Sequence, residues 1–106
     1  MPQPPIFTKQ VPMFLWIWEN RPHFSEISGE ALGNEMSVFF MAHILPKSLS
    51  KRFKCDPRNI CLMTPLEHHN YDHATQIAKR DPRYNWVFEM RQILKAQDHK
   101  LSGSKI

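Results

Sequence analysis

The first half of the chain consists of short apolar runs separated by proline and glycine. Four of the nine prolines fall in residues 1–12, which predicts an extended arm because proline cannot donate a backbone hydrogen bond. The apolar run 13–20 predicts a short helix that packs on two sides and ends at Arg21-Pro22. Residues 23–33 have the pattern of a strand, a tight turn at Ser28-Gly29 and a second short element.

The apolar pattern in the middle of the chain predicts a β-hairpin. Residues 37–45 alternate as a buried strand does, and Pro46 ends this strand. Residues 59–64 have the composition of a second strand, and Asp56-Pro57 before them is a turn signal. The two strands can therefore pair, with a long loop between them.

Two helices are predicted after the hairpin. Thr64-Pro65-Leu66-Glu67 is a helix start, with threonine as the cap, proline in the first turn and glutamate completing a capping box. This helix should continue to about residue 79, because Asp81-Pro82 then breaks the chain. Residues 82–97 have the pattern of another helix. Its apolar stripe comprises Trp86, Met90, Ile93 and Leu94.

Length and composition indicate one small globular domain. The chain has 106 residues, of which 42% are hydrophobic and 23% charged, and this leaves no room for a second core. We assign the domain to residues 13–100, between the extended arm 1–12 and a polar tail, 101–106. The predicted strands and helices give it an α+β fold. A domain this short is only marginally stable alone, which favours a bound metal ion or a partner subunit.

The chain shows no signal for a membrane or for secretion. No stretch approaches the roughly 18 uninterrupted apolar residues of a membrane span, and the densest apolar run, residues 11–18, is too short. The N-terminus lacks the charged start and the apolar centre of a secretory signal. We therefore expect a cytoplasmic protein with no membrane partner, in which Cys55 and Cys61 are thiols.

The net charge of +4 is concentrated in one connecting segment. Residues 47–58 contain five basic residues and one acidic residue, whereas the rest of the chain contains nine of each. A local excess of this kind attracts the phosphate backbone of a nucleic acid, although a solvated loop is the plainer interpretation. The predicted nucleic-acid-binding residues are Lys47, Lys51, Arg52, Lys54 and Arg58.

Several polar side chains come together if the hairpin and the following helix pack as predicted. His68 and Asp72 are four residues apart on a helix and share one face, so they can hold one divalent cation. Such a cation polarises a phosphate group. His43 on the first strand is suited to accepting a proton from water, because an imidazole titrates near pH ~6.5. This combination fits the hydrolysis of a phosphodiester bond.

These residues resemble the HNH endonucleases, in particular the branch that reads Ala-His-Ile-x-Pro, then Asn with an apolar strand, then His-x-x-aromatic-Asp. The matching residues are Ala42-His43-Ile44-Leu45-Pro46, Asn59 with the strand after it, and His68 with Tyr71-Asp72. The resemblance implies a ββα-metal core, similar to a treble clef, in which a β-hairpin packs on a helix. A short N-terminal helix and a C-terminal helix would flank this core.

The resemblance also implies roles for the catalytic residues His43, Asn59 and His68. His43 would be the general base, Asn59 would brace the hairpin and orient His43, and His68 with Asp72 would bind one divalent ion, Mg²⁺, Mn²⁺, Ni²⁺ or Zn²⁺. The implied activity is metal-dependent hydrolysis of DNA phosphodiester bonds, by nicking or double-strand cleavage. Sequence selectivity should be weak, because contacts to phosphate carry no sequence information.

The family resemblance extends to source and assembly. Small, free-standing HNH proteins are common in phages, and a phage-encoded member would act in the host cytoplasm. The apolar stripe of the last predicted helix is compatible with a homodimer, which would allow two single-strand cuts.

Two departures from the family pattern leave alternatives open. Many HNH members carry Asp or His directly before the base, where this chain has Ala42, so the fold can instead be an inactive nucleic-acid-binding module. Others hold a structural zinc with Cys-x-x-Cys, where this chain has Ser25-Glu-Ile-Ser28, and we expect no such zinc here. His69 and His73 form a second pair four residues apart, but only the register of His68 agrees with the family's spacing from Asn59.

Overall fold

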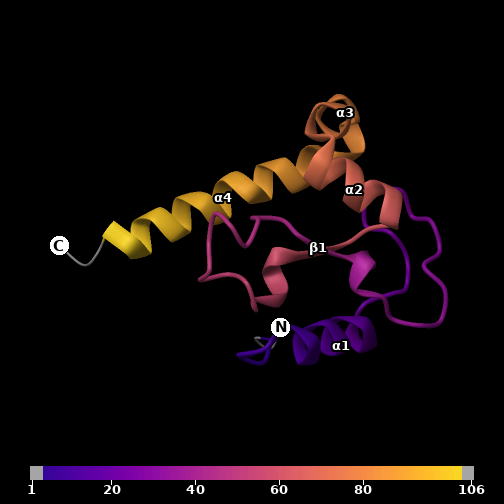
Figure 1. The fold of residues 1–106 in the computed structure, drawn as a ribbon, viewed down its shortest axis with the longest axis horizontal. Helices are drawn as coiled ribbons and strands as arrows, with labels where there is room; N and C mark the ends of the chain where they lie inside the picture. The colour runs from indigo at the N-terminus through magenta and orange to yellow at the C-terminus, as the bar shows by residue number, and fades with distance from the viewer. Residues whose placement is uncertain (1–3, 104–106) are drawn as a thin grey trace.

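A two-stranded antiparallel sheet lies at the centre of the structure, with helices on both sides of it (Figure 1). The computed structural model describes residues 4–103. Strand β1 (Met41–His43) pairs with strand β2 (Ile60–Leu62), so that the first residue of β1 is opposite the last residue of β2. The predicted α+β fold and the antiparallel hairpin are confirmed.

The two faces of the sheet pack against different helices. Helix α1 (Gln10–Asn20) lies on one side, and helices α2 (Pro65–His73) and α4 (Asn85–Gly103) lie on the other (Figure 1). Ala42 and Cys61 belong to the core cluster that includes α2 and α4. The strand residues that pack with α1 are Met41, Ile60 and Leu62.

Both strands are shorter than predicted because a 3-10 turn precedes each of them. Ser37 caps the first turn, Val38–Phe40, and Asp56 caps the second, Pro57–Asn59. In each case a side-chain oxygen accepts a hydrogen bond from a backbone N–H two residues later. Such local bonds compete with strand pairing, which explains why the strands begin only at Met41 and Ile60.

Helix α1 includes the last three residues, 10–12, that we assigned to the extended arm. Pro12 is tolerated because the first amides of a helix have no carbonyl partner within the helix. The helix ends at Asn20 as predicted, and Met13, Phe14, Ile17 and Trp18 are its buried residues.

Residues 23–33 form a turn in place of the predicted strand, turn and second short element. A single isolated β-bridge joins Phe24 to Ala31, and Gly29 between them has a φ of +80°. This backbone conformation favours glycine, in agreement with the predicted turn at Ser28-Gly29. We call residues 24–31 the knuckle.

Helix α2 starts with the predicted capping box, in which Thr64 and Glu67 exchange two hydrogen bonds. It ends at His73, earlier than expected, because Ala74 leaves the helical conformation with φ −130° and ψ 52°. The Thr75 hydroxyl donates to the carbonyl of Tyr71 at 3.3 Å, and such back-bonding bends helices. The chain then continues as the short helix α3 (Thr75–Arg80).

The last predicted helix is divided and longer than expected. A 3-10 turn at Pro82–Tyr84 precedes α4, which extends to Gly103. The helix therefore includes the first residues of the predicted polar tail, and residues 104–106 of that tail lie outside the described residues. Within residues 4–103, no helix combines the length and apolar character needed to cross a membrane.

Candidate active site

His43 at the end of β1 and the pair His68 and Asp72 on α2 line one open groove of about 790 Å³. The sequence separates these residues by up to 29 positions, and the packing of α2 against the hairpin brings them together. Three of the four predicted catalytic or metal-binding residues therefore share one surface. Helix α1 forms another wall of this groove through Phe14.

A hydrogen bond determines which ring nitrogen of His43 carries the hydrogen. Its Nε2 lies 2.9 Å from the carbonyl oxygen of Lys54, and a carbonyl can only accept, so Nε2 carries the hydrogen. In the neutral ring the lone pair is then on Nδ1, which is free to accept a proton. The Phe14 ring packs against His43 edge-on, with 6.1 Å between ring centres.

The surroundings of His43 keep it neutral. Burial of the ring lowers its pKa from the ordinary 6.5, and the nearby positive charge of Lys47 acts in the same direction. The Lys54 carbonyl and the charge of Asp72 oppose these effects but do not cancel them. A neutral imidazole at neutral pH is the form that a general base requires.

His68 and Asp72 are already directed toward each other. His68 Nδ1 donates to the carbonyl oxygen of Phe39 at 2.7 Å, and its Nε2 lies 3.0 Å from Asp72 Oδ2. The hydrogen bond with Asp72 raises the pKa of His68 above 6.5, against the opposing effect of burial. The carbonyl of Phe39 fixes the ring so that Nε2 faces the carboxylate, an arrangement typical of histidines that bind metals.

This pair fits the geometry of two ligands to one ion. A nitrogen and an oxygen that bind an ion at right angles, each at about 2.1 Å, lie about 3 Å apart. The described residues contain no group of three or more His, Cys, Asp and Glu side chains around a metal-sized point. A cation here would have two protein ligands, and water or phosphate oxygens would complete its coordination, as is usual for Mg²⁺.

Asn59 is not among the residues that line the groove. Its side chain is fully buried and makes three hydrogen bonds across the loop between the strands. Oδ1 accepts from the Leu45 amide at 2.7 Å, and Nδ2 donates to the carbonyls of Leu45 and Phe53 at 3.0 and 3.1 Å. Phe53 directly precedes Lys54, whose carbonyl holds His43. These contacts agree with the bracing role that the family resemblance implied.

Tyr71 fastens α2 to the end of the hairpin. The ring is almost completely buried, and the hydroxyl donates to the carbonyl of Ile44, the residue after His43. Arg91 on α4 lies over this ring, 5.8 Å from its centre, and lines the same groove. Sequence reasoning missed Arg91, because nothing in the pattern of α4 distinguishes it from other surface bases.

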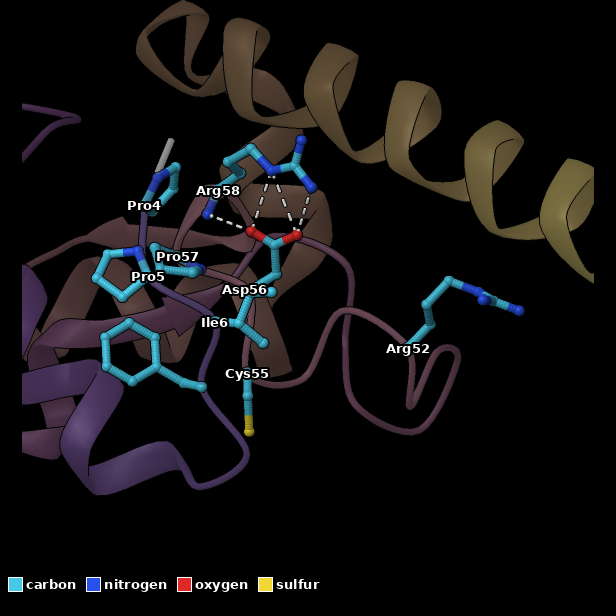
Figure 2. A pocket seen from close by; sticks show the side chains of 9 residues that line it. Pro4, Pro5, Ile6, Arg52, Cys55, Asp56, Pro57 and Arg58 are labelled. Carbon is cyan, nitrogen blue, oxygen red and sulfur yellow. Dashed lines mark hydrogen bonds and ion pairs between the residues drawn. The ribbon is translucent and has the colours of Figure 1, made fainter. Parts of the chain in front are cut away.

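The five predicted phosphate-binding residues do not all line the same pocket. Of these five, Lys47 lines the groove with His43. Arg52 pairs with Asp98 of α4 at 3.2 Å, and Arg58 pairs with Asp56 at 2.7 Å, so both charges are partly compensated. These two arginines line a different pocket, next to the N-terminal residues. Figure 2 shows Arg58 hydrogen-bonded to Asp56, and Arg52 directed away from that pair. Lys51 and Lys54 are exposed.

The knuckle is joined to α2 by a buried polar contact that the sequence did not indicate. Ser25 Oγ accepts hydrogen bonds from the backbone amides of Ile27 and Ser28, at 3.0 and 3.1 Å. The same hydroxyl donates a hydrogen bond to Glu67 Oε1 at 2.5 Å. Glu67 Oε1 also accepts the Thr64 amide at 2.8 Å. This contact connects the turn to the helix that carries His68.

Comparisons of this chain with protein-family models, with curated proteins and with solved structures gave no match.

Proposed function

We propose that the protein is a metal-dependent endonuclease that hydrolyses DNA phosphodiester bonds on a ββα-metal core. One observation carries the proposal: His43, with Nδ1 left to accept a proton, lines the same groove as the preorganised pair of His68 and Asp72. The order of elements, β1, β2 and then α2, supports the proposal, because a ββα-metal core has two strands followed by a helix.

Each side chain has a distinct task in this reaction. A cation held by His68 and Asp72 would stabilise the negative charge that develops on the phosphate and on the leaving oxygen. His43 Nδ1 accepts a proton from the water whose oxygen attacks phosphorus, and the bridging P–O bond breaks with its electron pair going to the leaving oxygen. The Lys54 carbonyl stabilises the ring as it becomes positively charged, since a hydrogen bond to a charged donor is stronger.

Lys47 and Arg91 complete the proposed substrate surface. Both line the groove, so they would contact DNA phosphates near the reacting group. Such contacts hold the backbone without selecting a base sequence. The substrate class that we propose is DNA, and its affinity should fall steeply as salt concentration rises.

A supercoiled-plasmid nicking assay tests the proposal. The untagged full chain is incubated with Mg²⁺, Mn²⁺, Ni²⁺ or Zn²⁺, and His43→Ala is compared with His99→Ala, which changes an exposed histidine outside the groove. We expect cutting that stops with chelator, is about 100-fold slower or worse in His43→Ala, and is unchanged in His99→Ala. Equal cutting by both variants would contradict the role of His43.

The same assay decides about the alternative, an inactive nucleic-acid-binding module. Ala42 favours this alternative, because it is fully buried in the core and supplies no ligand next to the base. Retardation of DNA in a gel without cutting under every metal would establish the module and refute the endonuclease.

A further inference from the structure

The outer surface of α2 carries a second pair of metal-binding side chains. His69 and His73 are four residues apart, and their ring centres lie 5.3 Å from each other at an angle of 45°. Both side chains are exposed. No hydrogen bond or ion pair joins either ring to another residue within 4–103, so their nitrogens are available to a ligand.

This pair is distinct from the pair in the groove. His69 follows His68 directly, and one residue turns an α-helix by about 100°. His69 is accordingly absent from the groove lining, whereas His73 is part of it. The carboxylate of Asp72 pairs with His68 at 3.0 Å. A metal ion on the outer surface of α2 would therefore be bound by the imidazoles of His69 and His73.

We infer that His69 and His73 form a second metal site, separate from the proposed catalytic site, that takes Ni²⁺, Cu²⁺ or Zn²⁺. Residues four apart lie on one helix face, so two imidazoles can bind one ion through nitrogens at about 2.0–2.1 Å. Because both side chains are exposed, small rotations can bring the nitrogens together without moving the backbone. Water completes the coordination.

The chemistry of the donors selects the metal. Imidazole nitrogen suits Zn²⁺, Cu²⁺ and Ni²⁺, whereas Mg²⁺ and Ca²⁺ prefer oxygen. The groove pair includes a carboxylate and therefore accepts the harder ions as well. A titration with Mg²⁺ should distinguish the two sites, because Mg²⁺ can bind His68 and Asp72 but should not bind His69 and His73.

The position of the site gives it a structural consequence. His73 is the last residue of α2, directly before the break at Ala74. An ion that joins His69 to His73 ties this last turn to the turn before it and stabilises the folded chain, because it binds the helical form alone. Ni²⁺ should therefore raise the melting temperature through this site as well as through the groove.

Isothermal titration calorimetry of the untagged full chain with Ni²⁺ and with Mg²⁺ tests this inference. We expect the unmodified chain to bind two equivalents of Ni²⁺, His69→Ala to bind one, and His99→Ala to bind two. Mg²⁺ binding should be the same with and without His69→Ala. Equal Ni²⁺ stoichiometry and affinity in the unmodified chain and in His69→Ala would overturn the second site.

The variant His68→Ala separates this inference from the proposed function. If His68→Ala keeps one Ni²⁺ equivalent and His69→Ala also keeps one, both sites exist. If His68→Ala leaves metal binding unchanged while His69→Ala abolishes it, the outer site stands and the catalytic site fails. Circular dichroism checks that each variant, changed on the surface of α2, remains folded.

Discussion

Replacing Asn59 with alanine should destabilise the protein more than any surface change. The side chain is fully buried and has three hydrogen-bond partners on the loop between the strands. Asn59→Ala leaves the amide and the carbonyl of Leu45 without a partner, whereas the Phe53 carbonyl keeps the hydrogen bond from the Asp56 amide at 3.2 Å. Each unpaired buried group costs about 1–3 kcal/mol. Taking the lower value for each, we expect a loss of about 2 kcal/mol from a total that is typically about 5–15 kcal/mol.

Urea unfolding followed by tryptophan fluorescence measures this change, because the chain contains three tryptophans. For a domain of this size, the loss corresponds to a decrease of about 8 °C in melting temperature. The matched control is Asn34→Ala, an exposed asparagine, which should change stability by less than about 0.5 kcal/mol. A loss below about 1 kcal/mol for Asn59→Ala would refute the bracing role.

Three further outcomes are expected. With metal at saturation, the midpoint of the decline in nicking rate at acid pH should lie below pH 6.5, because burial lowers the pKa of His43; a midpoint above pH 6.5 would contradict this. Replacing Lys47 and Arg91 with glutamine should reduce the salt slope of DNA binding, measured by fluorescence anisotropy, by about two, whereas Arg58→Gln should change it less. Ser25→Ala should cost about 2 kcal/mol in urea unfolding, since it removes a buried partner of three polar groups; an unchanged midpoint would show that the knuckle contact is dispensable.

Local signals in the sequence were sufficient to predict much of the fold. The capping box at Thr64 and Glu67 depends on residues three apart, and the hairpin depends on alternation within each strand. The lengths of the elements were less predictable. The side chains of Ser37 and Asp56 accept hydrogen bonds from nearby amides and so shorten the strands. Serine and aspartate at these positions are compatible with a strand as well as with a turn.

In the candidate site, contacts between residues close in the sequence were predictable, and contacts between distant residues were not. His68 and Asp72 are neighbours on one helix face, so their pairing followed from spacing alone. The distribution of positive charge did not follow from the sequence, because the Arg52 ion pair with Asp98 joins residues 46 positions apart. A count of bases in a segment contains no information about such distant partners. For the same reason, Arg91 could be placed in the groove only once α4 was packed against α2.

Diffraction from crystals of the full chain soaked in MnCl₂ would locate the ion on which the proposed activity depends. We predict an anomalous peak between His68 Nε2 and Asp72 Oδ2, about 2.1–2.2 Å from each, on the side of the groove that His43 lines. A groove without such a peak, or a peak that contacts neither side chain, would contradict the proposed convergence of base and cation on one phosphate.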